Sequence, residues 1–405
     1  MKFKRALLSL ALIFSICFVG TSKSYAIFGI EKKTTASLIG DAKSGALFVA
    51  ENIDEPLSIA SISKLMTYYL VKEKIAEGKL KMEDKVKISI NASREEGSSL
   101  NLKAGEQISI KDLLDGLMVV SGNDSAVALA EVVAESESKF VTMMNEKAKE
   151  LGLQNATFTN ASGLTKNGQD NKMSTRDIFT LSKAIIEKYP EVLEYAKTTV
   201  LEQPSRNFKK ESTIPLVGQV EGVDGLKTGH TDEAGYCLVS TMKIKKGETE
   251  FRVISVLMGA KTKADRAQYM KDMLNYAKQN IETRKIVDSE KFVKKVETKS
   301  ASQGFIELVP KENLERASMK GINYETEVTV DDVKLPLKKG DKVGEIKIKN
   351  SKEVIATVDL VAKEDYSKVG FVRRIGRFFK TVFEVVETIS VSYTHLRAHE
   401  TGRNL

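Results

Sequence analysis

Strand-like segments lie at both ends of a helix-rich stretch in the first two thirds of this 405-residue chain. Residues Ala36–Gly40 and Ala46–Glu51 alternate in the manner of a β-hairpin around the turn DAKSG. Two further strands, Tyr236–Ile244 and Phe251–Met258, flank the turn KKGE. Apolar residues at helical spacing predict helices that begin near Ser61 and then cover Ile110–Val120, Ser125–Glu135, Ser174–Lys188 and Lys263 to about Lys278. This order predicts an α/β domain in which one sheet joins both ends of the domain and the helices form an inserted lobe.

The sequence pattern changes from about Ile286. Short segments rich in Lys, Glu and Val alternate there, for example Glu327–Val330, Val343–Ile348 and Val354–Val361. They predict a small all-β domain. We therefore expect a first domain over residues 27–284 and a second over residues 285–365.

The first 26 residues have the features of a secretory signal peptide. Three basic residues precede an apolar run over Ala6–Gly20, and Ser24-Tyr25-Ala26 offers small residues for cleavage after Ala26. The run is shorter than the roughly 20 residues that a membrane span needs. The sequence therefore predicts an exported protein at the outer face of the cytoplasmic membrane, in a periplasm or a cell wall.

Cysteine content and charge further limit the possibilities. Of the two cysteines, only Cys237 lies outside the signal peptide, so an internal disulfide is not expected. The formal net charge of +8 falls to +4 once the four basic residues of the signal peptide are removed. In an exported protein this surplus favours a membrane or wall surface as partner and argues against nucleic acid.

Three short strings contain the residue types needed for nucleophilic catalysis. The first is Ser61-Ile62-Ser63-Lys64, which places Ser61 and Lys64 one turn apart on the same face of a helix. A serine hydroxyl needs a base, and only His230 of the three histidines lies before residue 391, where the chain is expected to stop being native. A Ser-Lys pair therefore replaces a Ser-His-Asp triad, provided that burial and a second cation such as Lys227 lower the pKa of Lys64.

The second and third strings supply polar groups that suit a substrate. Ser121-Gly122-Asn123 lies between two predicted helices, where a hydroxyl and an amide could relay a proton and hold a substrate amide, or simply cap a helix. The segment Asp224–His230 is expected to be an edge strand. On it, Lys227 and Thr228 suit a carboxylate, and Gly229 leaves room for another backbone.

With their flanking residues, these strings identify a family. The chain resembles the low-molecular-mass penicillin-binding proteins of the serine-type D-alanyl-D-alanine carboxypeptidase family. The segments that carry the resemblance are ASISKLMT at Ala60–Thr67, the residues Leu117–Asp124, and DGLKTGHTDEAGY at Asp224–Tyr236. The resemblance implies a β-lactamase/transpeptidase-like domain with a five-stranded, mainly antiparallel sheet flanked by helices, then a β-rich domain and a membrane-associating helix.

The resemblance also implies roles for individual residues, with peptidoglycan stem peptides as substrates and β-lactams as inhibitors. Ser61 would attack the carbonyl between the two terminal D-alanines and Lys64 would accept its proton. Ser121 would pass a proton to the leaving D-alanine, and Asn123 would orient the substrate amide. Lys227 and Thr228 would bind the terminal carboxylate beside Gly229, and the N–H groups of Ser61 and His230 would form the oxyanion hole. No metal or cofactor is implied, and Ser162 stands where many relatives carry a histidine.

The C-terminal segment over residues 366–390 is expected to be an amphipathic helix that lies on the membrane. Between Phe371 and Ile389, aromatic and aliphatic residues gather on one side and basic residues on the other, a pattern typical of a helix in the plane of an anionic membrane. Residues 391–405 are expected to be sequencing-adapter read-through rather than native protein, because VSYTHLRAHET at Val391–Thr401 resembles the translation of a transposase sequencing adapter.

Two alternatives to a carboxypeptidase stay open. A β-lactamase would share the same motifs, although the middle string is Ser-Gly-Asn rather than Ser-Asp-Asn. A membrane-bound receptor that binds stem peptides or traps β-lactams without turnover would also keep them. The intact Ser61 and Lys64 favour an enzyme.

Overall fold

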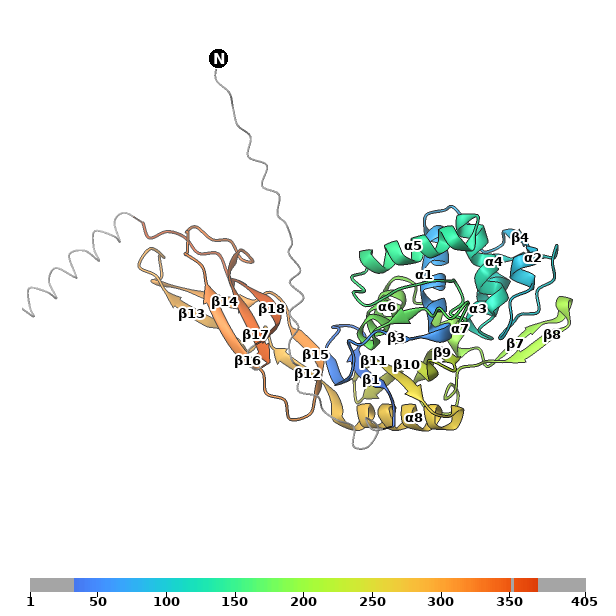
Figure 1. Cartoon of the computed structure of the whole chain (residues 1–405). Coiled ribbons are helices and arrows are strands. Elements are labelled where there is room, and N and C mark those ends of the chain that lie inside the picture. The colour runs from blue at the N-terminus through green and yellow to red at the C-terminus, as the bar shows by residue number, and fades with distance from the viewer. Residues whose placement is uncertain (1–32, 351–352, 371–405) are drawn as a thin grey trace, which may run out of the picture. The chain divides into compact units, whose positions relative to one another are not determined.

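The computed structural model describes residues 33–350 and 353–370, which fall into two compact units (Figure 1). The first unit runs to Glu282 and also includes Ala317–Lys320. The second comprises Thr283–Arg316 and the chain from Gly321 onward.

A five-stranded sheet forms the centre of the first unit. Its strand order is β2-β1-β11-β10-β9, and every neighbouring pair is antiparallel. The strands are β1 (Ala36–Asp41), β2 (Leu47–Glu51), β9 (Val223–Thr231), β10 (Gly235–Lys246) and β11 (Thr249–Ala260). Since β1 pairs with β11, the two ends of the unit meet in one sheet, as the strand pattern predicted.

Alternate residues of these strands face two separate hydrophobic layers. Leu38, Val239 and Val256 point into one layer, whereas their neighbours Ile39, Leu238 and Leu257 point into the other. Helix α8 (Lys263–Asn280) covers the second layer through Met270, Met273 and Leu274 (Figure 1). The remaining helices of the unit lie on the opposite side of the sheet. They are α1 (Lys64–Ala76), α2 (Ile90–Ser93), α3 (Ile110–Met118), α4 (Asn123–Ala134), α5 (Glu137–Glu150), α6 (Thr175–Lys188) and α7 (Val192–Lys197).

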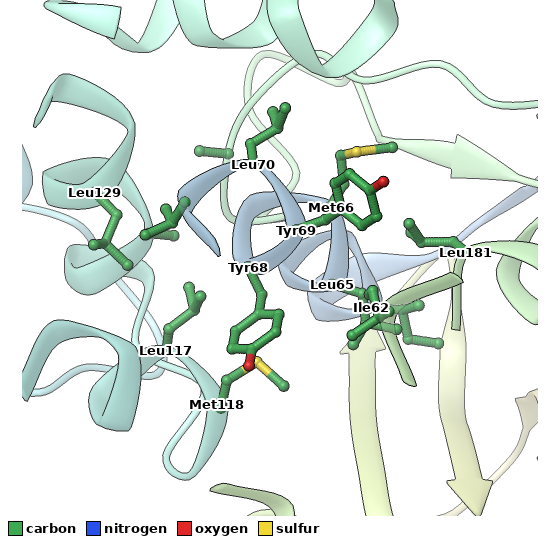
Figure 2. Packing of buried hydrophobic residues seen from close by; sticks show 14 of the residues in the cluster. Ile62, Leu65, Met66, Tyr68, Tyr69, Leu70, Leu117, Met118, Leu129 and Leu181 are labelled. Carbon is green, nitrogen blue, oxygen red and sulfur yellow. The ribbon is translucent and has the colours of Figure 1, made fainter. Parts of the chain in front are cut away.

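Helix α1 runs through the middle of the helical layer. Every residue from Lys64 to Lys72 is buried, because other helices and the sheet surround this helix (Figure 2). A helix that is apolar on all sides is typical of a protein core. Lys64 is consequently held in a dry environment by the fold itself.

The predicted helix boundaries agree with the structure to within two residues except at the start of α1, and three helices were not predicted. The expected helix at Ser61 begins with a 3₁₀ turn, η1 (Ala60–Ser63), and becomes α-helical only at Lys64. Helices α2, α5 and α7 were not among the predicted segments. At α6, the Ser174 hydroxyl accepts a hydrogen bond from the Asp177 N–H over 3.1 Å, as expected from a capping box.

Short strand pairs complete the first unit. They are β3 (Leu57–Ser58) with β6 (Lys172–Met173), β4 (Lys85–Lys87) with β5 (Gln107–Ser109), and β7 (Val200–Gln203) with β8 (Phe208–Glu211). A short turn, η2 (Pro204–Arg206), joins the last pair. The boundary of the first unit falls within strands β12 (Ile281–Val287) and β15 (Leu314–Met319), which pair with each other.

The second unit is all-β in the part of the chain that the structure describes. Its five-stranded sheet has the order β13-β14-β18-β17-β16. The strands are β13 (Lys294–Glu297), β14 (Phe305–Pro310), β16 (Glu325–Val330), β17 (Lys342–Asn350) and β18 (Glu353–Ala362). Ile306, Leu308, Ile346 and Leu360 form its fully buried centre. The fold class predicted from the sequence is therefore confirmed for both units.

The predicted signal peptide and amphipathic helix lie outside the described residues. Within residues 33–350 and 353–370, no helix is both long enough and apolar enough to cross a membrane.

Candidate active site

Ser61 lies on the 3₁₀ turn that leads into α1. Its neighbour Ala60 has a φ of +47°, in the left-handed region, and the Ser63 hydroxyl donates a hydrogen bond to the Ala60 carbonyl over 2.7 Å. This local bend leaves Ser61 partly exposed, whereas Lys64 on the next turn is fully buried. A partly exposed hydroxyl thus lies next to a fully buried amine.

The Lys64 amine contacts three oxygens. Its Nζ lies 2.8 Å from Ser61 Oγ, 2.6 Å from Asn123 Oδ1 and 2.7 Å from the Ser162 carbonyl. Burial, and secondarily the charge of Lys227, hold the pKa of Lys64 well below its usual value. A lysine in this state can be a neutral base at moderate pH, which an ordinary lysine cannot.

A second buried lysine contacts Ser121. Lys227 Nζ donates hydrogen bonds to Ser121 Oγ over 2.8 Å and to the Thr228 carbonyl over 3.1 Å. Burial, and then the positive charge of Arg266, lower the pKa of Lys227 to about 7. Ser121 itself has a φ of +60°, which the surrounding contacts must stabilise.

Asn123 is fixed at both ends of its amide. Its Oδ1 accepts from Lys64, and its Nδ2 donates to the Glu96 carbonyl over 2.6 Å. Its backbone N–H donates to the Ser98 carbonyl over 2.7 Å. The sequence identified Asn123 as a candidate residue, but it did not indicate the Glu96 and Ser98 carbonyls that orient it.

Strand β9 approaches the 3₁₀ turn closely at Gly229. A Cβ at this position would lie 2.7 Å from the Ile59 carbonyl oxygen and 3.3 Å from the Ala60 Cβ, so only glycine fits without displacement. Beside it, the Thr228 hydroxyl donates to Thr213 Oγ1 over 3.0 Å. The exposed His230 ring stacks on Tyr236 with a centroid distance of 3.9 Å. The structure thus brings β9 next to Ser61.

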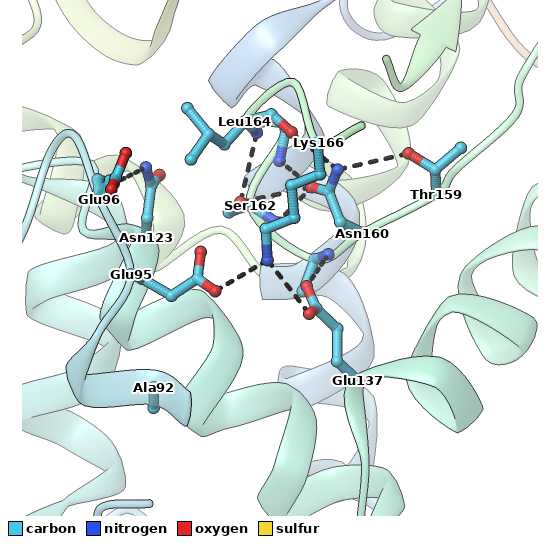
Figure 3. A network of polar contacts seen from close by, with 12 residues as sticks. Ala92, Glu95, Glu96, Asn123, Glu137, Thr159, Asn160, Ser162, Leu164 and Lys166 are labelled. Atoms are coloured by element: carbon cyan, nitrogen blue, oxygen red, sulfur yellow. Dashed lines mark hydrogen bonds and ion pairs between the residues drawn. The ribbon is translucent and has the colours of Figure 1, made fainter. Parts of the chain in front are cut away.

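The loop Asn160–Leu164 supplies a group that the sequence reasoning missed. The Ser162 carbonyl, rather than its side chain, accepts the hydrogen bond from Lys64. Asn160 Oδ1 shapes the loop by accepting from the Ser162 and Gly163 N–H groups, over 3.1 and 2.6 Å (Figure 3). Gly163 has a φ of +79°, and a Cβ there would lie only 1.9 Å from the Ala60 carbonyl oxygen. An Asn-x-x-Gly string predicts a turn, but nothing in it indicates contact with Lys64.

Arg266 on α8 is a further charged group near the site that the sequence did not indicate. Its side chain is buried, and its guanidinium lies over the Tyr236 ring at 5.8 Å from the centroid. It acts on Lys227 through its charge. Among the residues described, no group of three or more His, Cys, Asp or Glu side chains is arranged to hold a metal ion.

Comparison with known proteins places these features in a family. Residues 23–262 match the family described as D-alanyl-D-alanine carboxypeptidase, and residues 282–368 match the C-terminal domain of penicillin-binding protein 5. The chain is 36% identical to D-alanyl-D-alanine carboxypeptidase DacF of Bacillus subtilis over 360 residues, covering 85% of this chain and 91% of the relative. It is 32% identical to DacC of Escherichia coli over 359 residues, covering 86% of this chain and 88% of that one.

Solved structures agree with the sequence matches. Penicillin binding protein 5 from Haemophilus influenzae matches with a TM-score of 0.69 and 29% identity, over 83% of this chain and 98% of that one. Penicillin-Binding Protein D2 from Listeria monocytogenes, solved in an ampicillin-bound form, matches with a TM-score of 0.54 and 34% identity, over 60% and 96%. The buried Ser-Lys pair, the fold and these matches agree, and the chain belongs to the serine-type D-alanyl-D-alanine carboxypeptidase family of low-molecular-mass penicillin-binding proteins.

Proposed function

We propose that this protein removes the C-terminal D-alanine from peptidoglycan stem peptides through an acyl-enzyme on Ser61. The observation that carries this proposal is the 2.8 Å separation between Ser61 Oγ and the fully buried amine of Lys64, whose pKa is lowered. Family membership supports the same activity, since the curated relatives are named as D-alanyl-D-alanine carboxypeptidases.

Acylation begins when Lys64 Nζ takes the proton from Ser61 Oγ. The oxygen then forms a bond to the carbonyl carbon between the two terminal D-alanines. Negative charge develops on the carbonyl oxygen, and we place it between the backbone N–H groups of Ser61 and His230. Lys227 and Thr228 bind the terminal carboxylate, which restricts cleavage to the end of a peptide.

The C–N bond breaks as the leaving D-alanine nitrogen gains a proton from Ser121. The contact between Ser121 Oγ and Lys227 Nζ lets the lysine restore that proton. Water then attacks the ester carbonyl and gives up one proton, which Lys227 regains through Ser121. As the acyl–oxygen bond breaks, the Lys64 ammonium returns its proton to Ser61 Oγ. The products are the shortened peptide and free D-alanine.

β-Lactams fit the same chemistry as inhibitors. Their ring amide would acylate Ser61, and the broken ring would stay attached in place of a departing amino acid. The ampicillin-bound Listeria relative supports this part of the proposal. We further propose that the protein works outside the cytoplasmic membrane and is held at its surface by residues Phe371–Ile389, which lie outside the described structure.

Release of D-alanine tests the function directly. The mature chain from Ile27 and its Ser61→Ala variant are incubated with a diacetyl-Lys-D-Ala-D-Ala peptide, and free D-alanine is quantified. We expect release by the parent alone. No release together with stable penicillin labelling would instead support a receptor without turnover, and no release with rapid penicillin hydrolysis would support a β-lactamase.

A further inference from the structure

Two loops outside the sequence motifs hold the polar groups of the site. The Glu96 carbonyl accepts from Asn123 Nδ2 over 2.6 Å, and the Ser162 carbonyl accepts from Lys64 Nζ over 2.7 Å. The positions of these two carbonyls therefore fix where the Asn123 amide and the Lys64 amine lie relative to Ser61.

Lys166 connects these two loops. Its Nζ lies 2.8 Å from Glu95 Oε1, next to Glu96 in the first loop (Figure 3). It also lies 3.4 Å from Glu137 Oε2 on α5. The other oxygen of Glu137 accepts a hydrogen bond from the Ala161 N–H over 2.9 Å, one residue before Ser162. The Lys166 ammonium group thus links Glu95, next to the Glu96 carbonyl, to Glu137, which holds the residue before the Ser162 carbonyl.

Partial burial makes this bridge more costly to break than a typical surface ion pair. The side chains of Glu95 and Lys166 are 12% and 34% exposed. Within the described structure, Glu95 Oε2 is buried and has no hydrogen-bond partner. Removing the lysine charge would leave a nearly buried carboxylate without its cation, which is costly in a medium of low polarity. The loop would have to move to hydrate it.

We infer that Lys166 is a positioning residue for acylation: its bridge between Glu95 and Glu137 sets the spacing of the Glu96 and Ser162 carbonyls that hold Asn123 and Lys64. This inference rests on the proposed roles of Ser61 and Lys64. It adds a group that lies in none of the three motifs and that acts only through other residues.

The test measures the rate at which a fluorescent penicillin acylates the full mature chain. Lys166→Met removes the charge, Lys166→Arg keeps it, and Lys139→Met is the matched control. Lys139 pairs with Glu135, at the start of the same α5 region, but both side chains are largely exposed and hold no active-site loop. End-point labelling and thermal unfolding are recorded for each variant.

We expect Lys166→Met to acylate about tenfold more slowly, because a misplacement of about 1 Å can cost about 10²-fold and the loosened loops should shift by less. End-point labelling should stay complete, Lys166→Arg should recover most of the rate, and Lys139→Met should match the parent. Glu95→Gln should also slow acylation, and adding it to Lys166→Met should cost little more, since the two changes break one contact.

Two results would overturn the inference: a parent rate in Lys166→Met, or equal slowing in Lys166→Met and Lys166→Arg. If Lys166→Met labels incompletely because it folds poorly, Glu95→Gln decides the question. A parent acylation rate in Glu95→Gln, or slowing in Lys166→Arg as large as in Glu95→Gln, would then overturn the inference. Labelling that persists in Ser61→Ala would instead refute the proposed nucleophile, so the two failures are distinguishable.

Discussion

At the scale of single residues, the lowered pKa of Lys227 makes the free energy of unfolding depend on pH. Its folded-state pKa of about 7 lies below the roughly 10.4 of an unfolded chain. Between these values the unfolded chain binds a proton that the folded chain lacks, so this group makes stability rise with pH, by up to about 1.4 kcal/mol per unit. Lys227→Met should unfold with a shallower pH dependence, measured by urea titration between about pH 7 and 10. Parallel curves for parent and variant would contradict the pKa shift.

Lys64 gives a prediction about rate. Lys64→Met keeps the side-chain length but removes the proposed base, and acylation by penicillin should fall by about 10²- to 10⁴-fold. Lys72→Met is a suitable control, since Lys72 lies two turns further along the same buried helix and pairs with Glu191 at 2.8 Å. That variant should acylate at the parent rate if it folds. Equal loss in both variants would mean that helix packing, not the base, was disturbed.

The residues that the sequence could identify are those whose side chains carry the chemistry. Ser61 and Lys64 are one helical turn apart, so their spacing alone predicts the contact that the structure contains. The Ser162 carbonyl could not be found this way, because every residue has a carbonyl and its direction depends on the loop. Arg266 was missed because its influence on Lys227 arises only when α8 packs against the sheet.

At the scale of elements, the loop around Gly163 makes a sharp prediction. Gly163→Ala would place a Cβ 1.9 Å from the Ala60 carbonyl oxygen, at a φ of +79°. We expect a loss of several kcal/mol in the free energy of unfolding, beyond the roughly 1–2 kcal/mol of the backbone conformation alone. Gly168→Ala is the control, because Gly168 has a φ of +70° in the same region but open space around it. Equal destabilisation of both variants, by urea unfolding, would contradict the steric argument.

The long strands of the central sheet were predicted well, whereas one amphipathic helix was not. The long hairpin of β10 and β11 alternates over many residues, and its strands extend only slightly beyond the predicted ranges. Helix α5 was not predicted although its buried residues recur at helical spacing, since the many Lys and Glu residues around them lower its overall hydrophobicity. The buried residues are Phe140, Met144, Lys147 and Ala148. The 3₁₀ turn before α1 depends on contacts of Ala60 with distant loops, which local spacing does not reveal.

At the scale of the whole molecule, the composition of the first unit predicts the result of truncation. Ala317 and Met319 on β15 belong to the same hydrophobic cluster as Met270 and Met273 of α8. A chain that ends at Val287 lacks β15 and would expose this apolar surface, at a cost of about 2 kcal/mol. We expect its first unit to melt several degrees below that of the chain ending at Gly370. Coincident melting of the first unit in both chains would contradict the assignment.

The return of Ala317–Lys320 to the first unit also bears on how such proteins can be recombined. The polypeptide leaves the first unit, comes back for one short strand, and leaves again. A gene fusion with a single junction near residue 283 would therefore not exchange a complete module. It would import a foreign strand into the hydrophobic layer beneath α8, so a C-terminal part taken from a relative must carry a β15 that suits its new host.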